Sequence, residues 1–156
     1  MECKLLTLCM LREGDKLLLG MKKRGFGEGW YNGFGGKLEE GESLEEAAFR
    51  EMKEESGVKA KNLRKTGVLK FDFVDNRERL EVHVFHVTEY EGEPIESEEM
   101  KPEWFHVDEI PFNKMWPDDI HWLPLFLEGH LFEGVFSFDK DHKMLSHNVK
   151  KVDSLN

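Results

Sequence analysis

The chain has 156 residues, a length typical of one domain, and its 22 basic residues are outnumbered by 32 acidic ones, giving a formal net charge of -10. This negative charge argues against sequence-independent binding to the backbone of a nucleic acid. The N-terminus has no basic leader or small-residue cleavage site, and no apolar run reaches the ~18 residues of a membrane span. We therefore expect a single domain over residues 1–156, with neither a membrane nor a nucleic-acid polymer as partner.

The two cysteines, Cys3 and Cys9, alternate with apolar neighbours near the N-terminus. They do not form a C-x-x-C pair, and free cysteine is among the residue types most often buried. We expect both to be small buried side chains of a protein in a reducing compartment. The expected location is the cytoplasm, and additional nuclear and mitochondrial fractions are left open.

The chain begins with a predicted hairpin and a glycine-rich loop. Residues 4–11 and 16–22 are rich in Leu and Met and flank a Glu-Gly-Asp turn, the pattern of two strands joined tightly. Six glycines then fall within residues 24–36, between aromatic side chains. Because glycine permits sharp bends and close backbone contacts, this segment is expected to be a loop or a bulged strand that approaches another group closely.

A helix over about 44–56 is the most clearly marked element of the chain. Ser43 and Glu46 have the spacing of a capping box, and Gly57 supplies a left-handed stop. One side of this helix carries an apolar line, formed by Leu44, Ala48 and Met52. Burial of that line would hold the neighbouring side chains at the edge of the core.

The second half of the chain predicts further strands and one more helix. The expected elements are strands at 66–74 and 80–88, a polar connection at 91–101, a short strand at 104–107, a helix at 118–128, and a hairpin at 132–138 and 143–152. Strands and helices are interspersed without regular βαβ alternation. This order favours an α+β fold with a mixed sheet over a doubly wound fold.

Three carboxylates, Glu51, Glu54 and Glu55, fall on one side of the predicted helix. Like charges three and four residues apart repel one another, so the stripe gains nothing as plain helix surface. A divalent cation would reverse the sign of this effect, and carboxylate oxygens suit magnesium or manganese. The alternative is a solvated acidic face, which is common in acidic proteins.

The carboxylates belong to a longer pattern, G-x5-E-x7-R-E-U-x-E-E-x-G-U, in which U is aliphatic. Its nine specified positions are Gly36, Glu42, Arg50, Glu51, Met52, Glu54, Glu55, Gly57 and Val58. This segment, residues 36–58, resembles the box of the Nudix hydrolase family. The resemblance implies an α/β/α fold, with a mixed β-sheet sandwiched between helices, and hydrolysis of a nucleoside diphosphate linked to another group.

The resemblance also implies roles for residues of the box. Glu51, Glu54 and Glu55, together with the carbonyl of Gly36, would hold Mg²⁺, for which Mn²⁺ can substitute. Arg50 would orient a glutamate, and its alternative role as a salt-bridge partner on the helix is compatible with that. The metal would neutralise phosphate oxygens and align a water for in-line attack.

Three segments outside the box, 20–37, 96–102 and 115–119, resemble the branch of this family that hydrolyses oxidised purine nucleoside triphosphates. This resemblance implies a monomer that converts 8-oxo-dGTP, 2-hydroxy-dATP and related small molecules to the monophosphate and pyrophosphate, and so cleans the nucleotide pool. The residues implied to read the base are Asn32, Trp116, Asp118 and Asp119, and Pro117 is implied to be a further substrate-binding residue. Those implied to line the nucleotide site are Thr7, Lys22, Phe34, Gly35, Gly36 and Lys37, and Glu99 is implied as an additional metal ligand.

Several of these residues also have ordinary structural explanations. Proline and aspartate are common at a helix start, and Asn32-Gly33 is a frequent turn pair. Yet an indole can stack on a purine, and two neighbouring carboxyls in a dry pocket cannot both ionise cheaply. If one Asp stays protonated, the pair offers a donor and an acceptor, which would fit an oxidised guanine or an oxidised adenine.

Two rival functions follow from the same residues. A Nudix enzyme with another substrate, such as a methylated purine triphosphate or a nucleoside diphosphate sugar, would carry the same box. A nucleotide-binding module without turnover is the rival from a different class, and the intact glutamates argue against it.

The aromatic residues Phe26, Phe71 and Phe73 are expected in the core or the pocket wall. The basic cluster Lys22 to Arg24 is expected either to attract a triphosphate or to be a solvated turn.

Overall fold

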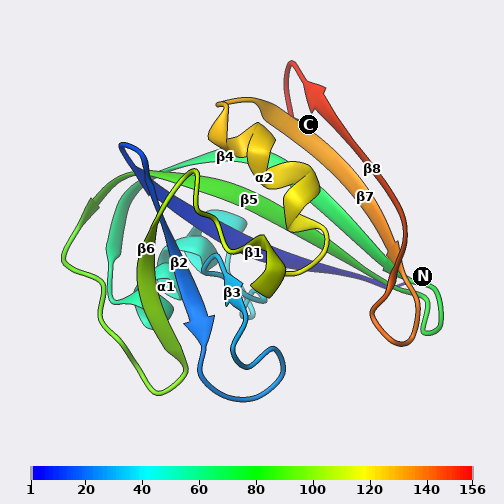
Figure 1. The fold of residues 1–156 in the computed structure, drawn as a ribbon, viewed down its shortest axis with the longest axis horizontal. Coiled ribbons are helices and arrows are strands. Elements are labelled where there is room, and N and C mark those ends of the chain that lie inside the picture. Colours follow the sequence, from blue (N-terminus) through cyan, green and yellow to red (C-terminus); the bar gives the residue numbers. More distant parts are fainter. Residues whose placement is uncertain (1, 156) are drawn as a thin grey trace.

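The structure is a computed structural model that describes residues 2–155. The described chain forms two α-helices, one short 3-10 helix and eight strands of a single sheet (Figure 1). The strands are β1 Glu2–Glu13, β2 Lys16–Lys22, β3 Tyr31–Asn32, β4 Lys59–Phe73, β5 Glu78–Glu91, β6 Met100–His106, β7 Leu131–Phe138 and β8 Met144–Val152. The helices are α1 Leu44–Ser56, η1 Phe112–Lys114 and α2 Asp119–Leu127.

The sheet is mixed, with the strand order β3-β2-β1-β5-β4-β7-β8 and β6 added on β2. Parallel pairing joins β1 to β5 and β4 to β7, while the other neighbours are antiparallel. One helix covers each face, α2 in front of the sheet and α1 behind it in Figure 1. The predicted α+β sandwich is confirmed.

Alternation along the strands explains the two layers, because successive side chains of a strand point to opposite faces. Cys9 and Leu11 of β1 pack on the α1 side, whereas Met10 between them packs on the α2 side. The core on the α1 side includes Leu18, Ala48, Met52 and Phe85. The core on the α2 side includes Leu17, Leu19, Trp122, Leu123, Phe132 and Phe136.

The sheet forks between β1 and β2, and this fork positions the candidate site. The two strands pair only between residues 11–13 and 16–18, after which β1 follows β5 and β2 follows β6 and β3. Residues 34–37 enter the fork and bond to β1, with the Thr7 N–H donating to the Gly36 carbonyl at 2.9 Å. A Cβ at Gly35 would lie 1.9 Å from the Thr7 carbonyl oxygen, so only glycine fits there.

The predicted elements are present, but several have different bounds. The hairpin over 4–11 and 16–22, the helix over 44–56 and the last hairpin are confirmed. The strands expected at 66–74 and 80–88 are longer, because polar residues extend both arms of the β4–β5 hairpin. The strand expected at 104–107 begins earlier, at Met100. No helix in residues 2–155 is long and apolar enough to span a membrane.

The expectation for the cysteines is half right. Cys9 is fully buried, but Cys3 is exposed, so its predicted burial is wrong. Both side chains point to the same face of β1, six residues apart. The core on the α1 side includes Cys9, whereas Leu5, between the two cysteines on that face, is 40% exposed. The alternation of side chains along β1 shows on which face of the sheet a cysteine lies, but not how far α1 covers that face.

Candidate functional site

Helix α1 is fixed at both ends and holds the predicted carboxylates in place. The Ser43 hydroxyl accepts a hydrogen bond from the Glu46 N–H at 3.1 Å, and the Glu46 carboxylate accepts one from the Ser43 N–H at 3.0 Å. Gly57 ends the helix with a φ of 81°. Burial of Ala48 and Met52 turns the glutamates to the edge of the core.

Arg50 ties the box together. Its guanidinium donates two hydrogen bonds to Glu42, at 2.6 and 2.9 Å, and lowers the pKa of that carboxyl. It also donates to Glu51 and, at 3.2 Å, to Glu54. The arginine thus bridges the loop before α1 and two of the three predicted carboxylates.

Glu55 is partly buried, whereas Glu54 is exposed. It accepts a hydrogen bond from the Gly35 N–H at 2.8 Å. Burial raises the pKa of Glu55 to about 7, and the charges of Glu51 and Glu54 add to this, against the opposing effect of the Gly35 N–H. A carboxylate held in this way would gain from a nearby cation.

The donor set suits a hard divalent ion, because it consists of carboxylates and a backbone carbonyl. Gly36 lies against Glu51, since a Cβ on Gly36 would be 3.0 Å from the Glu51 Oε2. Among residues 2–155, no group of three or more His, Cys, Asp or Glu side chains has ligating geometry. The Arg50 guanidinium donates to Glu51 and Glu54, so it already neutralises part of the negative charge that a bound cation would neutralise.

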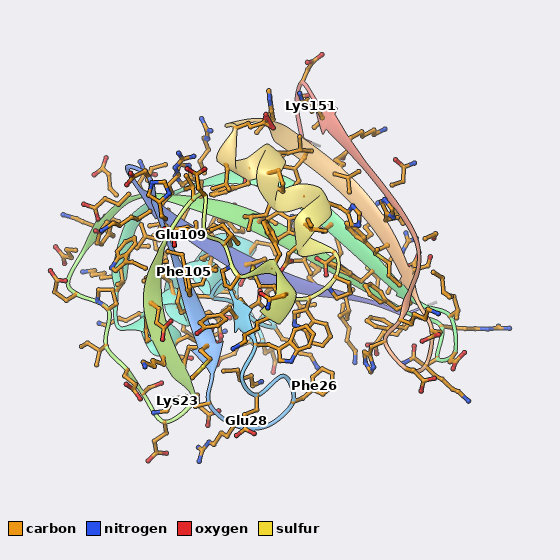
Figure 2. The ribbon with its side chains drawn as sticks, in the orientation of Figure 1. Lys23, Phe26, Glu28, Phe105, Glu109 and Lys151 are labelled. Atoms are coloured by element: carbon orange, nitrogen blue, oxygen red, sulfur yellow. The ribbon has the colours of Figure 1, made fainter. Side chains whose placement is uncertain are left out.

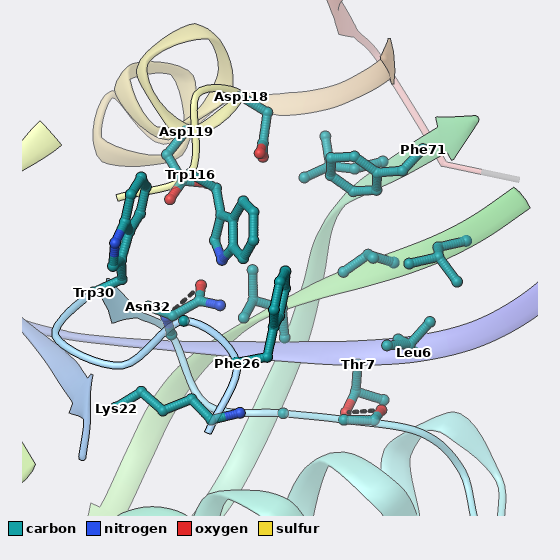
Figure 3. Close-up of a pocket in the computed structure, with 18 of the residues that line it drawn as sticks. Leu6, Thr7, Lys22, Phe26, Trp30, Asn32, Phe71, Trp116, Asp118 and Asp119 are labelled. Carbon is teal, nitrogen blue, oxygen red and sulfur yellow. Dashed lines mark hydrogen bonds between the residues drawn. The ribbon is translucent and has the colours of Figure 1, made fainter. Parts of the chain in front are cut away.

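A cavity of about 540 Å³ opens beside the box (Figure 3). It lies where the sheet forks, and both helices contribute to its wall. The predicted residues that line it are Thr7, Lys22, Asn32, Gly35, Gly36, Glu55, Trp116, Asp118 and Asp119. The structure therefore brings together residues that are separated by more than a hundred positions in sequence.

Of the predicted residues of α1, only Glu55 lines the cavity, and four predicted residues outside α1 do not line it. The Phe34 side chain is fully buried in the core on the α1 side, and Lys37 and Pro117 point to solvent. Glu99 accepts hydrogen bonds from Arg24 at 2.6 and 2.9 Å. Each of these four residues either is next to a cavity-lining residue in the chain or lies on a neighbouring loop. A segment that resembles the family because of its lining residues therefore includes them as well.

Asp118 and Asp119 line the cavity at the start of α2. The Trp122 indole N–H donates to Asp118 at 2.9 Å and to Asp119 at 3.1 Å. The Asp119 Oδ2 is buried and has no partner among the described residues. Burial raises the pKa of both carboxyls, and that of Asp119 is raised further by the charge of Asp118.

Aromatic rings surround the mouth of the cavity. Trp116 lies 5.4 Å from Phe26 and 5.6 Å from Trp30, measured between ring centroids. Figure 3 shows the three rings facing the same space, and Figure 2 shows Phe26 on the loop after β2. His142, in the turn between β7 and β8, contacts Phe26 at 5.3 Å. Sequence reasoning missed Trp30 and His142, although an aromatic residue among glycines was a usable signal for Trp30.

The basic cluster Lys22 to Arg24 separates into two roles. Lys23 bonds to Glu96 at 2.6 Å and Arg24 pairs with Glu99, so both hold the loop before β6. Only Lys22 of the three lines the cavity.

Asn32 accepts a hydrogen bond from the Gly33 N–H at 2.9 Å through its side-chain oxygen. Asn32 ends strand β3 and no turn is present at Asn32-Gly33, so its predicted turn role is wrong, while its amide nitrogen stays available to a ligand.

Comparison with known proteins identifies relatives over the full length of this fold. The NUDIX domain profile matches residues 6–126. The chain is 49% identical over 152 residues to the oxidized purine nucleoside triphosphate hydrolase of Danio rerio, and 48% identical over 151 residues to that of Mus musculus, with 97% of each chain covered. It is 34% identical over 148 residues to YvcI, an uncharacterized Nudix hydrolase of Bacillus subtilis, with 92% of both chains covered.

A solved structure shows the same similarity in three dimensions. The MutT protein of Bacillus halodurans superposes with a TM-score of 0.84 at 32% identity, over 94% of this chain and 97% of that one. The overall fold of this chain is therefore one already seen by experiment.

Proposed function

The chain belongs to the Nudix hydrolase family, and on this premise we propose that it is a magnesium-dependent pyrophosphohydrolase of oxidised purine nucleoside triphosphates. Its substrates are 8-oxo-dGTP, 2-hydroxy-dATP and related nucleotides, which it converts to the monophosphate and pyrophosphate. The reaction removes damaged purines from the nucleotide pool before they enter DNA. The protein acts as a monomer in the cytoplasm, and nuclear and mitochondrial fractions are compatible with this role.

The proposal rests on one observation. Two buried carboxyls and part of the box, its glycine backbone and the Glu55 carboxylate, line the same cavity. Asp118 and Asp119 line it from the start of α2, and Gly35, Gly36 and Glu55 line it from the box. A nucleotide likewise has two different parts, with a base at one end and phosphates at the other. The vertebrate relatives are named as hydrolases of a substrate of this kind, an oxidized purine nucleoside triphosphate.

At the base end, Trp116 offers an indole face on which a purine can stack. Asp119, whose pKa is raised by burial, keeps its proton and donates, while Asp118 accepts. The Asn32 amide nitrogen adds a second donor. An oxidised guanine and an oxidised adenine both present a donor and an acceptor on one edge, so this set accommodates either.

At the phosphate end, Lys22 attracts the triphosphate, and the glycines allow the backbone to approach it. Glu51, Glu54, Glu55 and the Gly36 carbonyl are the proposed ligands of Mg²⁺, with Mn²⁺ as a substitute and Glu99 as a further ligand once Arg24 releases it. When bound, the metal neutralises phosphate oxygens and activates a water. Arg50 keeps Glu51 and Glu54 oriented, and Thr7, Phe34, Lys37 and Pro117 contribute by holding the surrounding backbone.

The test is pyrophosphate release from a panel of oxidised, methylated and normal purine triphosphates and nucleoside diphosphate sugars, with magnesium present. We expect the oxidised purines to be hydrolysed fastest. Glu55→Gln should lower kcat by at least about a hundredfold and leave nucleotide binding in place. Glu45→Gln, on the exposed side of the same helix, is the matched control and should keep full activity.

Two results would overturn the proposal. If methylated purines or nucleotide sugars were the best substrates, the enzyme class would stand and the oxidised-purine assignment would fall. If wild-type protein released pyrophosphate from none of the panel, the chain would be a binding module rather than an enzyme.

A further inference from the structure

Two histidines that no part of the proposed reaction uses are stacked beside the base end of the cavity. His121 of α2 and His147 of β8 have ring centroids 3.8 Å apart and planes inclined by 21°. Two imidazolium cations at this distance would repel each other, so the stack favours at most one proton. Stacked rings do not converge their nitrogens on one point, as a chelated metal would require.

The pair adjoins the carboxyls that face the base. His121 immediately precedes Trp122, whose indole N–H donates to both Asp118 and Asp119. The backbone N–H of His121 donates to the Asp118 carbonyl at 2.9 Å. His121 thus lies one helical turn from Asp118, and a positive charge on its imidazole lowers the pKa of the Asp118 carboxyl against the larger opposing effect of burial.

The groups that face His121 come from two elements. Asp118 lies on its own helix and favours a proton on the imidazole, whereas His147 on β8 opposes it. Burial also opposes the proton and is the largest cause of the lowered pKa of His121. On β7 the residue paired with His147 is Phe136, which carries no charge.

We propose that the His121–His147 pair is a positioning pair that sets the protonation state of Asp118 during purine recognition; this inference rests on the proposed function. As the pH falls, Asp118 tends to take up a proton, but His121 takes one up as well. The charge on His121 then favours ionised Asp118. The pair thus keeps Asp118 an acceptor, beside the donor Asp119, over a wider pH range than the carboxyls alone would allow.

The first experiment needs no turnover. In the free protein, the pH dependence of the Asp118 carboxyl carbon and of the histidine ring signals is followed by NMR between about pH 5 and pH 8. We expect Asp118 to show an inflection at the pH where His121 titrates. His121→Phe keeps an aromatic ring on His147 and should remove the inflection, whereas His147→Phe should move it to higher pH by relieving the repulsion.

The second experiment measures recognition. The ratio of kcat/KM for the oxidised guanine and oxidised adenine triphosphates is determined over the same pH range. In His121→Phe this ratio should change about threefold more across the range than in the wild type, an estimate for one partly screened charge near Asp118. His130→Phe, beyond the other end of α2, is the matched control and should follow the wild type.

An Asp118 signal with the same single inflection in wild type and His121→Phe would overturn the inference, as would an unchanged ratio profile in a folded variant. A stoichiometric effect of Zn²⁺ on both histidine signals would assign the pair to a metal site instead and overturn it too. If the wild type hydrolyses neither nucleotide, the proposed function fails, while the NMR experiment still decides whether His121 controls the charge of Asp118.

Discussion

Gly35 and Gly36 both bring backbone to the side of the cavity next to the box, but a side chain would meet different groups at the two positions. A Cβ at Gly35 would meet the Thr7 carbonyl oxygen at 1.9 Å, and one at Gly36 would meet the Glu51 Oε2 at 3.0 Å. Backbone cannot move aside without disturbing β1, whereas the end of a glutamate side chain can. The two glycines therefore have different roles, one in folding and one in the placement of a carboxylate.

Replacing each glycine by alanine should separate these roles. Gly35→Ala should destabilise the fold by about 2 to 4 kcal/mol, because the methyl group overlaps backbone. Gly36→Ala should cost less than about 1 kcal/mol and lower kcat about tenfold or more, because it displaces Glu51. Urea denaturation and pyrophosphate release measure the two effects. Equal losses of stability in both variants would contradict this distinction.

Asp119 should make the fold less stable as the pH rises. Its folded pKa is raised by burial and by the charge of Asp118. Such a group makes its full contribution to the free energy of unfolding below the pKa that it has in the unfolded chain, about 3.9. The contribution is lost as the pH rises through the pKa of the folded state, and each unit of difference between the two pKa values corresponds to about 1.4 kcal/mol. Asp119→Asn has no proton to lose and keeps the same shape. Its unfolding free energy, relative to wild type, should therefore increase with pH.

Urea denaturation between about pH 5 and pH 9 checks this prediction, and the free energy of unfolding of Asp119→Asn relative to wild type is expected to rise across that range. Asp153→Asn, at an exposed carboxyl, is the control and should show no such trend. A difference that stays constant with pH would mean that Asp119 is ionised in the folded protein, and the donor role assigned to it would be lost.

Residues of the site were predictable where the chemistry is local and missed where it depends on distant segments. The spacing of Glu51, Glu54 and Glu55 could be read from the helix period. Nothing local indicated that Phe34 is buried while its neighbours Gly33 and Gly35 line the cavity, because that depends on how the fork receives residues 34–37. The contact of His142 with Phe26 likewise joins two loops more than a hundred residues apart.

At the scale of elements, α1 serves as a rigid support, and its cap should matter for stability but not for chemistry. Ser43→Ala removes the hydroxyl that accepts from the Glu46 N–H and should lower the free energy of unfolding by about 1 kcal/mol. The kcat should stay within about twofold of wild type, since Arg50 still binds Glu42 and Glu51. Urea denaturation and steady-state kinetics test both statements, and a tenfold loss of kcat would show that the cap also positions the carboxylates.

The elements themselves follow from local signals to different degrees. Helix α1 has caps at both ends, so its bounds could be predicted almost to the residue. The strands β4 and β5 run on through polar stretches, because each is paired along its length by the other and by β1 or β7. Pairing partners are tertiary information, which periodicity in one segment does not contain.

At the scale of the whole molecule, the two helices on opposite faces contribute to one cavity only because the sheet forks between β1 and β2. The box reaches the cavity from the α1 side, and Asp118 and Asp119 reach it from the α2 side. A continuous sheet would separate the two sets of carboxyls. The fork is not evident from sequence, since the predicted hairpin pattern gives no sign that its strands part after three residue pairs.

The concentration of negative charge at the box leads to the last prediction. Magnesium should raise the melting temperature of the wild type, because a ligand that binds only the folded state stabilises it, by about 1.4 kcal/mol at tenfold its Kd. Sodium chloride at matched ionic strength should not reproduce the shift. It screens the charges of the whole chain, whose net charge is -10, and does not act at the box in particular. Glu55→Gln should lose most of the shift and Glu45→Gln should keep it. Equal shifts in both variants would place the magnesium away from the box, and removal of the metal with a chelator should return the wild type to its starting temperature.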